Sequence, residues 1–153
     1  MQAETPRFGV GDASFQAAGG ASGLRLLVET FYRLMASDER FRTIVDMHPR
    51  DLATSIDKLA LFLGGWLGGP RMYQSNYGSI SIPLVHEKLA ITVAEHDQWL
   101  TCMAEAIEQQ GYSDQFSAYL HKQLRAPAAS VLKRCAEVQE TRTKTIPSTV
   151  KTP

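Results

Sequence analysis

The chain has 153 residues, which is enough for one domain with a sizeable core but too few for two comfortable domains. It carries 16 Lys and Arg residues against 16 Asp and Glu residues, so its formal net charge is zero. Nucleic acids and anionic membranes select basic surfaces, and the composition therefore indicates neither as a partner. Hydrophobic residues make up 44% of the chain, which is ordinary for a soluble globular protein.

The cysteines and the N-terminus indicate a reducing compartment. Cys102 and Cys135 lie far apart in the sequence, each in a helical pattern. Residues 1–8 contain no apolar run of the kind found in secretory signals. The apolar patches are also far shorter than the roughly 20 residues that a membrane span needs. We therefore expect a cytoplasmic protein without a membrane-spanning segment.

The first strong helical pattern begins at Leu24. Its apolar residues recur at i, i+3, i+4, i+7, i+8 and i+11, which predicts a wide buried stripe. Gly19 and Gly20 allow a tight turn before this helix, and Ser22 is the expected N-cap. Tyr32 lies on the stripe, so its hydroxyl either reaches water at the edge of the stripe or needs a partner inside. The stripe consists of Leu24, Leu27, Val28, Phe31, Tyr32 and Met35.

A second helix is predicted after a short helical turn and loop at residues 38–49. This helix covers about residues 51–67, and the sequence Gly68-Gly69-Pro70 ends it because glycine and proline disfavour helix. Residues 71–78 are expected to form a loop. One face of the helix carries Ser55, Leu59, Phe62, Leu63 and Trp66.

Two more helices complete the pattern. Thr92 is the expected N-cap of the first, which extends to about Gln110. Ser113 is the expected N-cap of the last helix, and Pro127 is expected to kink or break it. The buried face of the first of these helices consists of Trp99, Met103, Ala106 and Ile107.

These elements predict an all-α fold with one domain over residues 14–138. No stretch alternates as a strand does, and no segment repeats. Residues 1–13 and 139–153 are expected to be flexible, because the first are glycine-rich and the tail is rich in Thr, Lys and Pro.

His86 is the histidine that lies well inside an apolar run. Zinc needs three or four ligands at close spacing, and the sequence has no CxxC or HExxH motif. A haem needs only one protein bond, because the porphyrin supplies four nitrogens. An all-helical chain with one buried histidine is therefore compatible with haem, although a packed core histidine gives the same pattern. No nucleophile elbow, phosphate loop or dinucleotide fingerprint supports a hydrolase or nucleotide-binding function.

Five segments together carry a more specific signal. They are FQAAGG (Phe15–Gly20), FYRLMASDE (Phe31–Glu39), MHPRDL (Met47–Leu52), KLALFLGGWLGGP (Lys58–Pro70) and HDQWLTCMAEAI (His96–Ile107). Taken together, and at these separations, they resemble the group II truncated haemoglobins of bacteria. The resemblance implies a globin-like, truncated 2-on-2 helical sandwich, in which the glycine motifs let the shortened helices close around a haem.

The resemblance also implies the cofactor and the residues that hold it. The cofactor would be haem b, with His86 as the proximal iron ligand, thirteen positions before Trp99 as in the family. Trp99 resembles the tryptophan parallel to the haem, and Tyr32 resembles the distal tyrosine. His48 resembles the polar residue just after the helix that carries this tyrosine, which is tyrosine in some members and histidine in others. Further pocket residues are expected at Ser55, Leu59, Phe62, Ile91 and Met103.

The segment before His86 departs from the family. Members commonly have a basic, proline-containing run there, but this chain has GSISIPLVH at residues 78–86, and Leu89-Ala90 replaces a phenylalanine-proline pair. The arginines that would pair with the haem propionates are therefore missing. Candidate substitutes are Arg71, Tyr73, Tyr77 and Lys88.

Three functions follow as hypotheses. The first is reversible binding of dioxygen or another diatomic ligand, with tight retention by a polar distal pocket and with the chain as a monomer or weak homodimer. The second is a redox enzyme acting on nitric oxide or peroxide at the same iron, which needs a separate reductase because the chain has no flavin or nicotinamide domain. The third is a haem-free helical interaction module in which His86 is a core residue.

Overall fold

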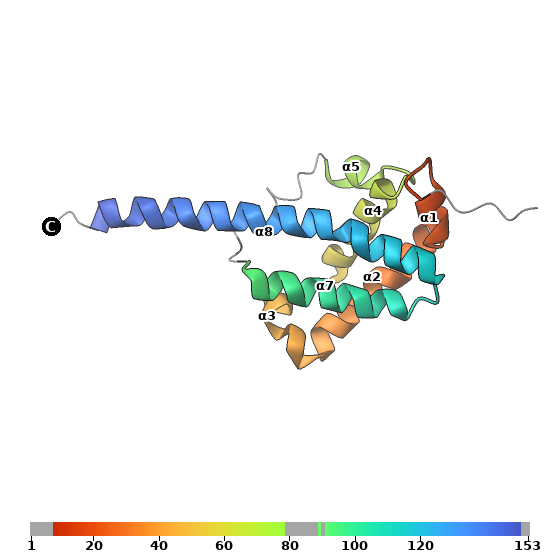
Figure 1. Ribbon diagram of the computed structural model, residues 1–153, viewed down its shortest axis with the longest axis horizontal. Coiled ribbons are helices and arrows are strands. Elements are labelled where there is room, and N and C mark those ends of the chain that lie inside the picture. Colours follow the sequence, from red (N-terminus) through yellow and green to blue (C-terminus); the bar gives the residue numbers. More distant parts are fainter. Residues whose placement is uncertain (1–7, 79–88, 90, 151–153) are drawn as a thin grey trace, which may run out of the picture.

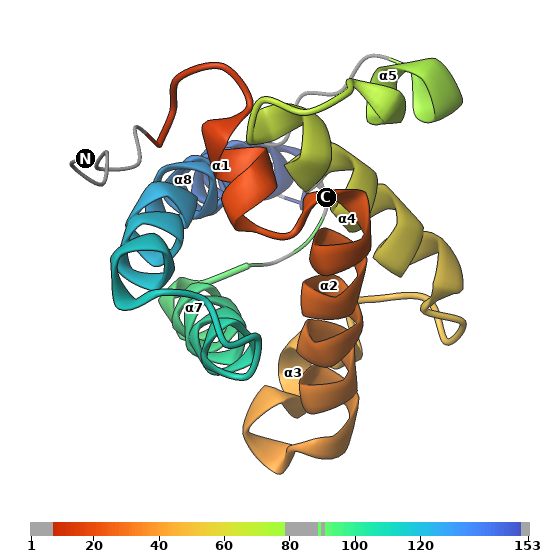
Figure 2. The same cartoon turned by 90° about the vertical axis from the view of Figure 1, so that its right-hand side faces the viewer.

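Four long helices pack as two crossed pairs. The computed structural model describes residues 8–78, 89 and 91–150, with side chains up to residue 140. Helix α2 (Gly20–Ser37) packs against α4 (Ala53–Trp66), and α7 (Val93–Glu108) packs against α8 (Asp114–Val150) (Figure 1). Helix α2 also contacts α7, so the two pairs form two layers (Figure 2). The described residues contain no strand, and the all-α, 2-on-2 sandwich is confirmed.

Short helices connect the long ones. Helix α1 (Ala13–Ala17) precedes α2, and η1 (Glu39–Phe41) with α3 (Arg42–Val45) form the expected helical turn after it. Helix α5 (Met72–Tyr77) follows α4, so the expectation of a loop over residues 71–78 is wrong. The six-residue helix is too short to show helical periodicity, because its sequence covers less than two turns.

The start of α2 also differs from the sequence prediction. Gly19 is the N-cap residue, with φ of 91°, and the helix begins at Gly20 rather than after Ser22. A left-handed backbone conformation favours glycine, so the cap is determined by the backbone and not by a serine side chain. The predicted apolar stripe is confirmed, because all six of its residues are buried.

The start of α7 is fixed by the predicted cap. The backbone N–H of Thr92 donates to Glu95 Oε1 at 2.8 Å, and the Thr92 hydroxyl donates to the same oxygen at 2.7 Å. This satisfies a backbone donor before the first turn and places a carboxylate near the positive end of the helix dipole. The helix ends at Glu108, close to the expected Gln110.

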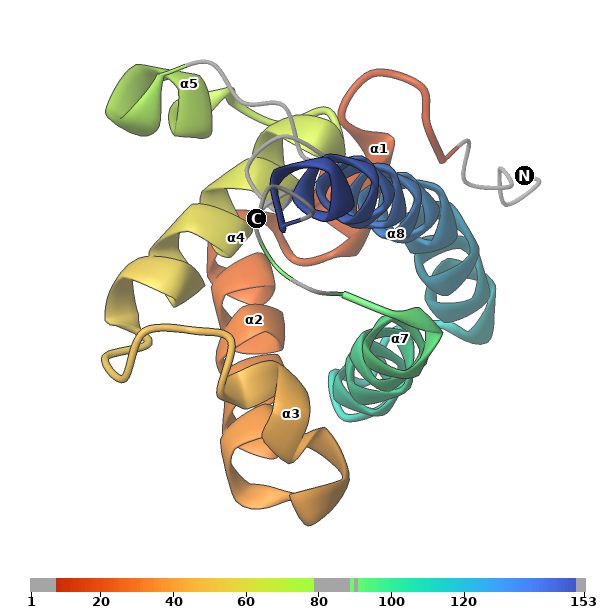
Figure 3. The same cartoon turned by 90° about the vertical axis from the view of Figure 1, so that its left-hand side faces the viewer.

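Helix α8 continues through Pro127, so the alternative of a break is wrong, and a kink at Pro127 stays a prediction. Proline removes one backbone donor and clashes with the preceding turn, but buried residues on both sides hold this helix in place. Phe116, Leu120 and Leu124 are buried before the proline, and Cys135 is buried after it. The C-terminal part of α8 extends beyond the other helices (Figure 1), and Figure 3 shows this helix nearly end-on. No helix in residues 8–78 or 91–150 is both long and apolar enough to cross a membrane.

Two glycines let α1 approach the end of α4. Gly68 has φ of 96°, and a Cβ atom at this position would collide with the carbonyl oxygen of Gly11. A Cβ atom at Gly69 would collide with the ring of Phe15. The backbone N–H of Phe15 donates to the Leu67 carbonyl at 3.1 Å, which joins the two segments.

Gly68→Ala is therefore expected to lower the free energy of unfolding by about 3 kcal/mol or more, from left-handed strain and the backbone collision together. Gly111→Ala is the matched control, because Gly111 has φ of 74° but no atom within 4 Å of its Cβ position. The control should lose only about 1 kcal/mol. Urea unfolding of both variants measures the difference, and equal losses would contradict the role of the close approach.

Candidate functional site

Tyr32 on α2 is a buried phenol at the edge of the core. Its side chain is 6% exposed, and its ring lies 5.0 Å from the ring of Phe31 and 5.3 Å from that of His48, measured between centroids. Among the residues that the structure describes, its hydroxyl has no hydrogen-bond partner. Burial, together with the nearby Cys102, raises the pKa of this phenol well above its usual value. Tyr32 is therefore a buried side chain whose hydroxyl stays protonated and can donate a hydrogen bond.

His48 lies beside Tyr32, just after α3. Its Nδ1 atom is 2.8 Å from the carbonyl oxygen of Ile44, and the two rings meet edge to face at 80°. A carbonyl oxygen only accepts, so Nδ1 carries the proton in this hydrogen bond. A second donor from this ring, at Nε2, then requires the imidazolium form.

Helix α7 brings Trp99 and Met103 to the same region. Trp99 is half-buried and its ring lies 5.3 Å from that of Phe31, at 67°. Met103 is fully buried one turn later. Ile91, directly before the helix, is also half-buried. Phe31 thus touches both Tyr32 and Trp99, which come from different layers of the fold.

Helix α4 supplies a half-buried face. Ser55, Leu59 and Phe62 lie on one side of the helix, and all three are partly exposed. Leu59 and Phe62 pack against the buried core, as the sequence pattern predicts. The packing of α2 against α4 leaves this apolar face partly uncovered. Such a face can pack against a flat apolar group such as a porphyrin.

The residues around α5 form a separate aromatic group. The Tyr73 ring is 6.5 Å from that of Phe62 and 5.3 Å from that of Tyr77. The Tyr77 hydroxyl donates to the carboxylate of Asp57, which raises the pKa of Tyr77. Arg71 is exposed at the start of α5. The roles of Arg71, Tyr73 and Tyr77 toward haem propionates stay predictions.

His86 and Lys88 lie outside the described residues, so the structure describes one wall of the expected pocket. This wall fits haem on two counts. It combines an apolar face on α4 with the buried side chain of Tyr32 on α2, whose hydroxyl has no hydrogen bond to another described residue. His86 as the iron ligand stays a prediction.

Sequence reasoning missed two features near this wall. The Cys102 thiol, on α7, donates to the Phe31 carbonyl oxygen at 3.3 Å. The side-chain oxygen of Gln98 is buried and has no hydrogen-bond partner among the described residues. Neither feature follows from helical periodicity, which identifies a buried face but not whether a polar atom on that face finds a partner on another helix.

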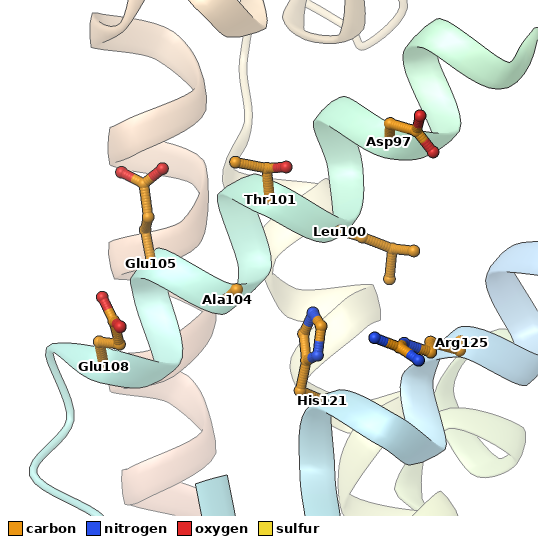
Figure 4. Close-up of a pocket in the computed structure, with 8 residues that line it drawn as sticks. All are labelled: Asp97, Leu100, Thr101, Ala104, Glu105, Glu108, His121 and Arg125. Carbon is orange, nitrogen blue, oxygen red and sulfur yellow. The ribbon is translucent and has the colours of Figure 1, made fainter. Parts of the chain in front are cut away.

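A hollow of about 510 Å³ lies elsewhere, between α7 and α8 (Figure 4). Asp97, Glu105 and Glu108 line it from α7, and His121 and Arg125 line it from α8. None of the predicted site residues lines this hollow. It therefore lies apart from the candidate site.

Two buried groups and one half-buried group predict a loss of stability in alkali. Burial raises the pKa of Cys102 from 9.0 to about 12 and that of Tyr112 from 10.0 to about 12, and it also raises the pKa of Tyr32. Above pH 9 the unfolded chain releases these protons while the folded chain retains them, so unfolding becomes more favourable. We expect the urea midpoint to be constant from pH 7 to 8.5 and to fall steadily between pH 9 and 12. A midpoint that rises across this window would contradict the prediction.

Comparison with known proteins places the chain among globins. A family model described as "Bacterial-like globin" matches residues 13–132. The protein named "Group 2 truncated hemoglobin YjbI" from Bacillus subtilis (strain 168) is 33% identical over 118 residues. This match covers 75% of the present chain and 87% of the relative.

Solved structures similar to this chain are also haemoglobins. A cold-adapted truncated haemoglobin from Pseudoalteromonas haloplanktis TAC125 has a TM-score of 0.75 at 27% identity, over 78% of this chain and 96% of its own. A group II 2-on-2 haemoglobin from Agrobacterium tumefaciens has a TM-score of 0.74 at 27% identity, over 86% and 97% of the two chains. A truncated oxygen-avid haemoglobin from Bacillus subtilis has a TM-score of 0.70 at 30% identity, over 78% and 98%.

Proposed function

Because this chain belongs to the bacterial-like globin family, among the group II truncated haemoglobins, we propose that it binds dioxygen reversibly and retains it tightly. Haem b is the cofactor of this family. The hypothesis of a haem-free helical module is therefore no longer a candidate. The observation that carries tight retention is the buried Tyr32 side chain, whose hydroxyl has no hydrogen bond to another described residue.

The proposal gives a role to each residue expected around the haem. When bound, the haem iron supplies the coordination position at which a diatomic ligand is held. His86 would hold the haem through a ring nitrogen. Leu59 and Phe62 exclude water from the pocket, and Tyr32 and Trp99 supply hydrogen-bond donors for the ligand. A protonated His48 is a third donor.

The number of donors sets the expected strength of retention. One hydrogen bond contributes about 1 kcal/mol, and more when the acceptor carries negative charge. Two or three donors acting together would slow oxygen release by on the order of 10- to 1000-fold, since each 1.4 kcal/mol is a factor of ten. Such retention suits oxygen sensing, scavenging or redox chemistry better than bulk delivery. The Bacillus subtilis relative, described as oxygen-avid, supports the proposal.

Oxygen displacement from the haem-loaded chain tests this function. Mixing the oxygenated protein with carbon monoxide in a stopped-flow spectrometer gives the rate of oxygen release. Slow release together with negligible turnover of nitric oxide or peroxide supports the proposal. Fast release contradicts it, and rapid turnover in the presence of a reductase and its electron donor would favour the redox enzyme instead.

A further inference from the structure

Phe31 forms a bridge between the two proposed donors. It is fully buried, and its ring meets Tyr32 at 5.0 Å and 68° and Trp99 at 5.3 Å and 67°. Both contacts are edge-to-face, an arrangement that depends on the relative orientation of the rings. Any movement of Phe31 relative to α7 therefore changes the placement of Tyr32 relative to Trp99.

The Cys102 thiol fixes Phe31 against α7. Cys102 is fully buried, and its sulfur lies 3.3 Å from the carbonyl oxygen of Phe31. A carbonyl oxygen has two lone pairs, so it accepts the thiol in addition to a backbone donor. Cys102 follows Trp99 by about one helical turn, and Phe31 directly precedes Tyr32. The hydrogen bond thus joins the turn that carries one donor to the turn that carries the other.

A second side-chain hydrogen bond between the same elements lies further along. Gln110, just after α7, donates from Nε2 to the Thr30 hydroxyl at 3.1 Å. On the α7 side this bond lies about three turns beyond Trp99, while on α2 Thr30 directly precedes Phe31. The two bonds therefore allow a comparison between a link near Trp99 and a link far from Trp99 along α7.

We propose that Phe31 and Cys102 are positioning residues, and that the thiol hydrogen bond sets the relative placement of Tyr32 and Trp99 and thereby the rate of oxygen release. This inference rests on the proposed function and deepens it. Tyr32 is buried, and its hydroxyl has no hydrogen bond to another described residue. The position of Tyr32 therefore determines whether this hydroxyl can donate to a bound ligand.

Cys102→Val keeps the volume of the side chain approximately and removes the donor, while Cys102→Ser keeps a donor. In the haem-loaded protein we expect Cys102→Val to release oxygen about three- to tenfold faster than wild type, which is the effect of weakening one hydrogen bond. The carbon–oxygen stretching frequency of the carbon monoxide complex should shift as well, because it reports the field of the nearby donors. Cys102→Ser should restore part of both properties. Cys102→Ala serves as the donor-free variant should valine overpack the core.

Gln110→Leu is the matched control, because it removes the other side-chain link between the two elements. It should lower the urea midpoint but leave the release rate and the stretching frequency unchanged. The inference is wrong if the donor-free Cys102 variants leave both properties at wild-type values, or if Gln110→Leu changes them equally.

A Tyr32→Phe variant distinguishes this inference from the proposed function. If Tyr32→Phe accelerates release and the donor-free Cys102 variants do not, only the positioning role fails. If Tyr32→Phe itself has no effect, tight retention by the distal donors fails.

Discussion

Replacing His86 with alanine is expected to abolish stable haem binding. A globin haem is attached to the protein through one axial bond, so this substitution removes the single protein–iron bond. We expect haem to be lost on the order of 100-fold faster or more, since even changes around a metal ligand cost 10- to 100-fold. The measurement is the Soret absorbance that remains with the protein after gel filtration.

His121→Ala is the control for this experiment. His121 is half-buried on α8 and lines the hollow away from the candidate site, so its loss should leave haem retention unchanged. Free imidazole added to His86→Ala should restore part of the axial bond. Haem retention equal to that of wild type in His86→Ala would assign the iron ligand to another residue.

Tyr32→Phe is expected to accelerate oxygen release by about tenfold, because it removes the hydroxyl of this buried side chain and little else. Trp99→Phe removes the indole N–H and should act in the same direction. The double variant is expected to release oxygen by on the order of 100-fold faster than wild type. Stopped-flow displacement by carbon monoxide measures all three rates.

Tyr112→Phe provides the matched control. The Tyr112 hydroxyl donates to the carbonyl oxygen of Ala18 at 3.1 Å, and Tyr112 is not one of the candidate site residues, so its removal should not alter oxygen release. Release from Tyr32→Phe and Trp99→Phe at the wild-type rate would show that these side chains do not hold the ligand.

Much of the fold could be predicted, because helical periodicity records which faces are buried. The stripe on α2 and the caps at Thr92 and Ser113 follow from local sequence, and Phe116 N–H indeed donates to the Ser113 hydroxyl at 3.1 Å. The errors lie where packing or backbone geometry outweighs local preference. Pro127 continues a helix that neighbouring buried residues hold, and Gly19 caps α2 through a left-handed conformation.

The candidate site could be predicted only in part. The sequence places Tyr32 on a buried stripe, but spacing alone does not show whether its hydroxyl reaches water. The assignment of His86 depends on the family resemblance and not on any pattern of ligands. The contact between Phe31 and Cys102 joins residues 71 positions apart, and a hydrogen bond between two helices leaves no periodic signal in either.

The cap at Thr92 also constrains how this protein can change in length. Because Glu95 fixes where α7 begins, Trp99 lies at a set rotation roughly two helical turns later. One residue inserted between Thr92 and Trp99 would turn the indole by about 100° around the helix axis, away from Phe31. Homologues that keep this aromatic contact should therefore vary in length outside that short interval, and deletions within it should be rare.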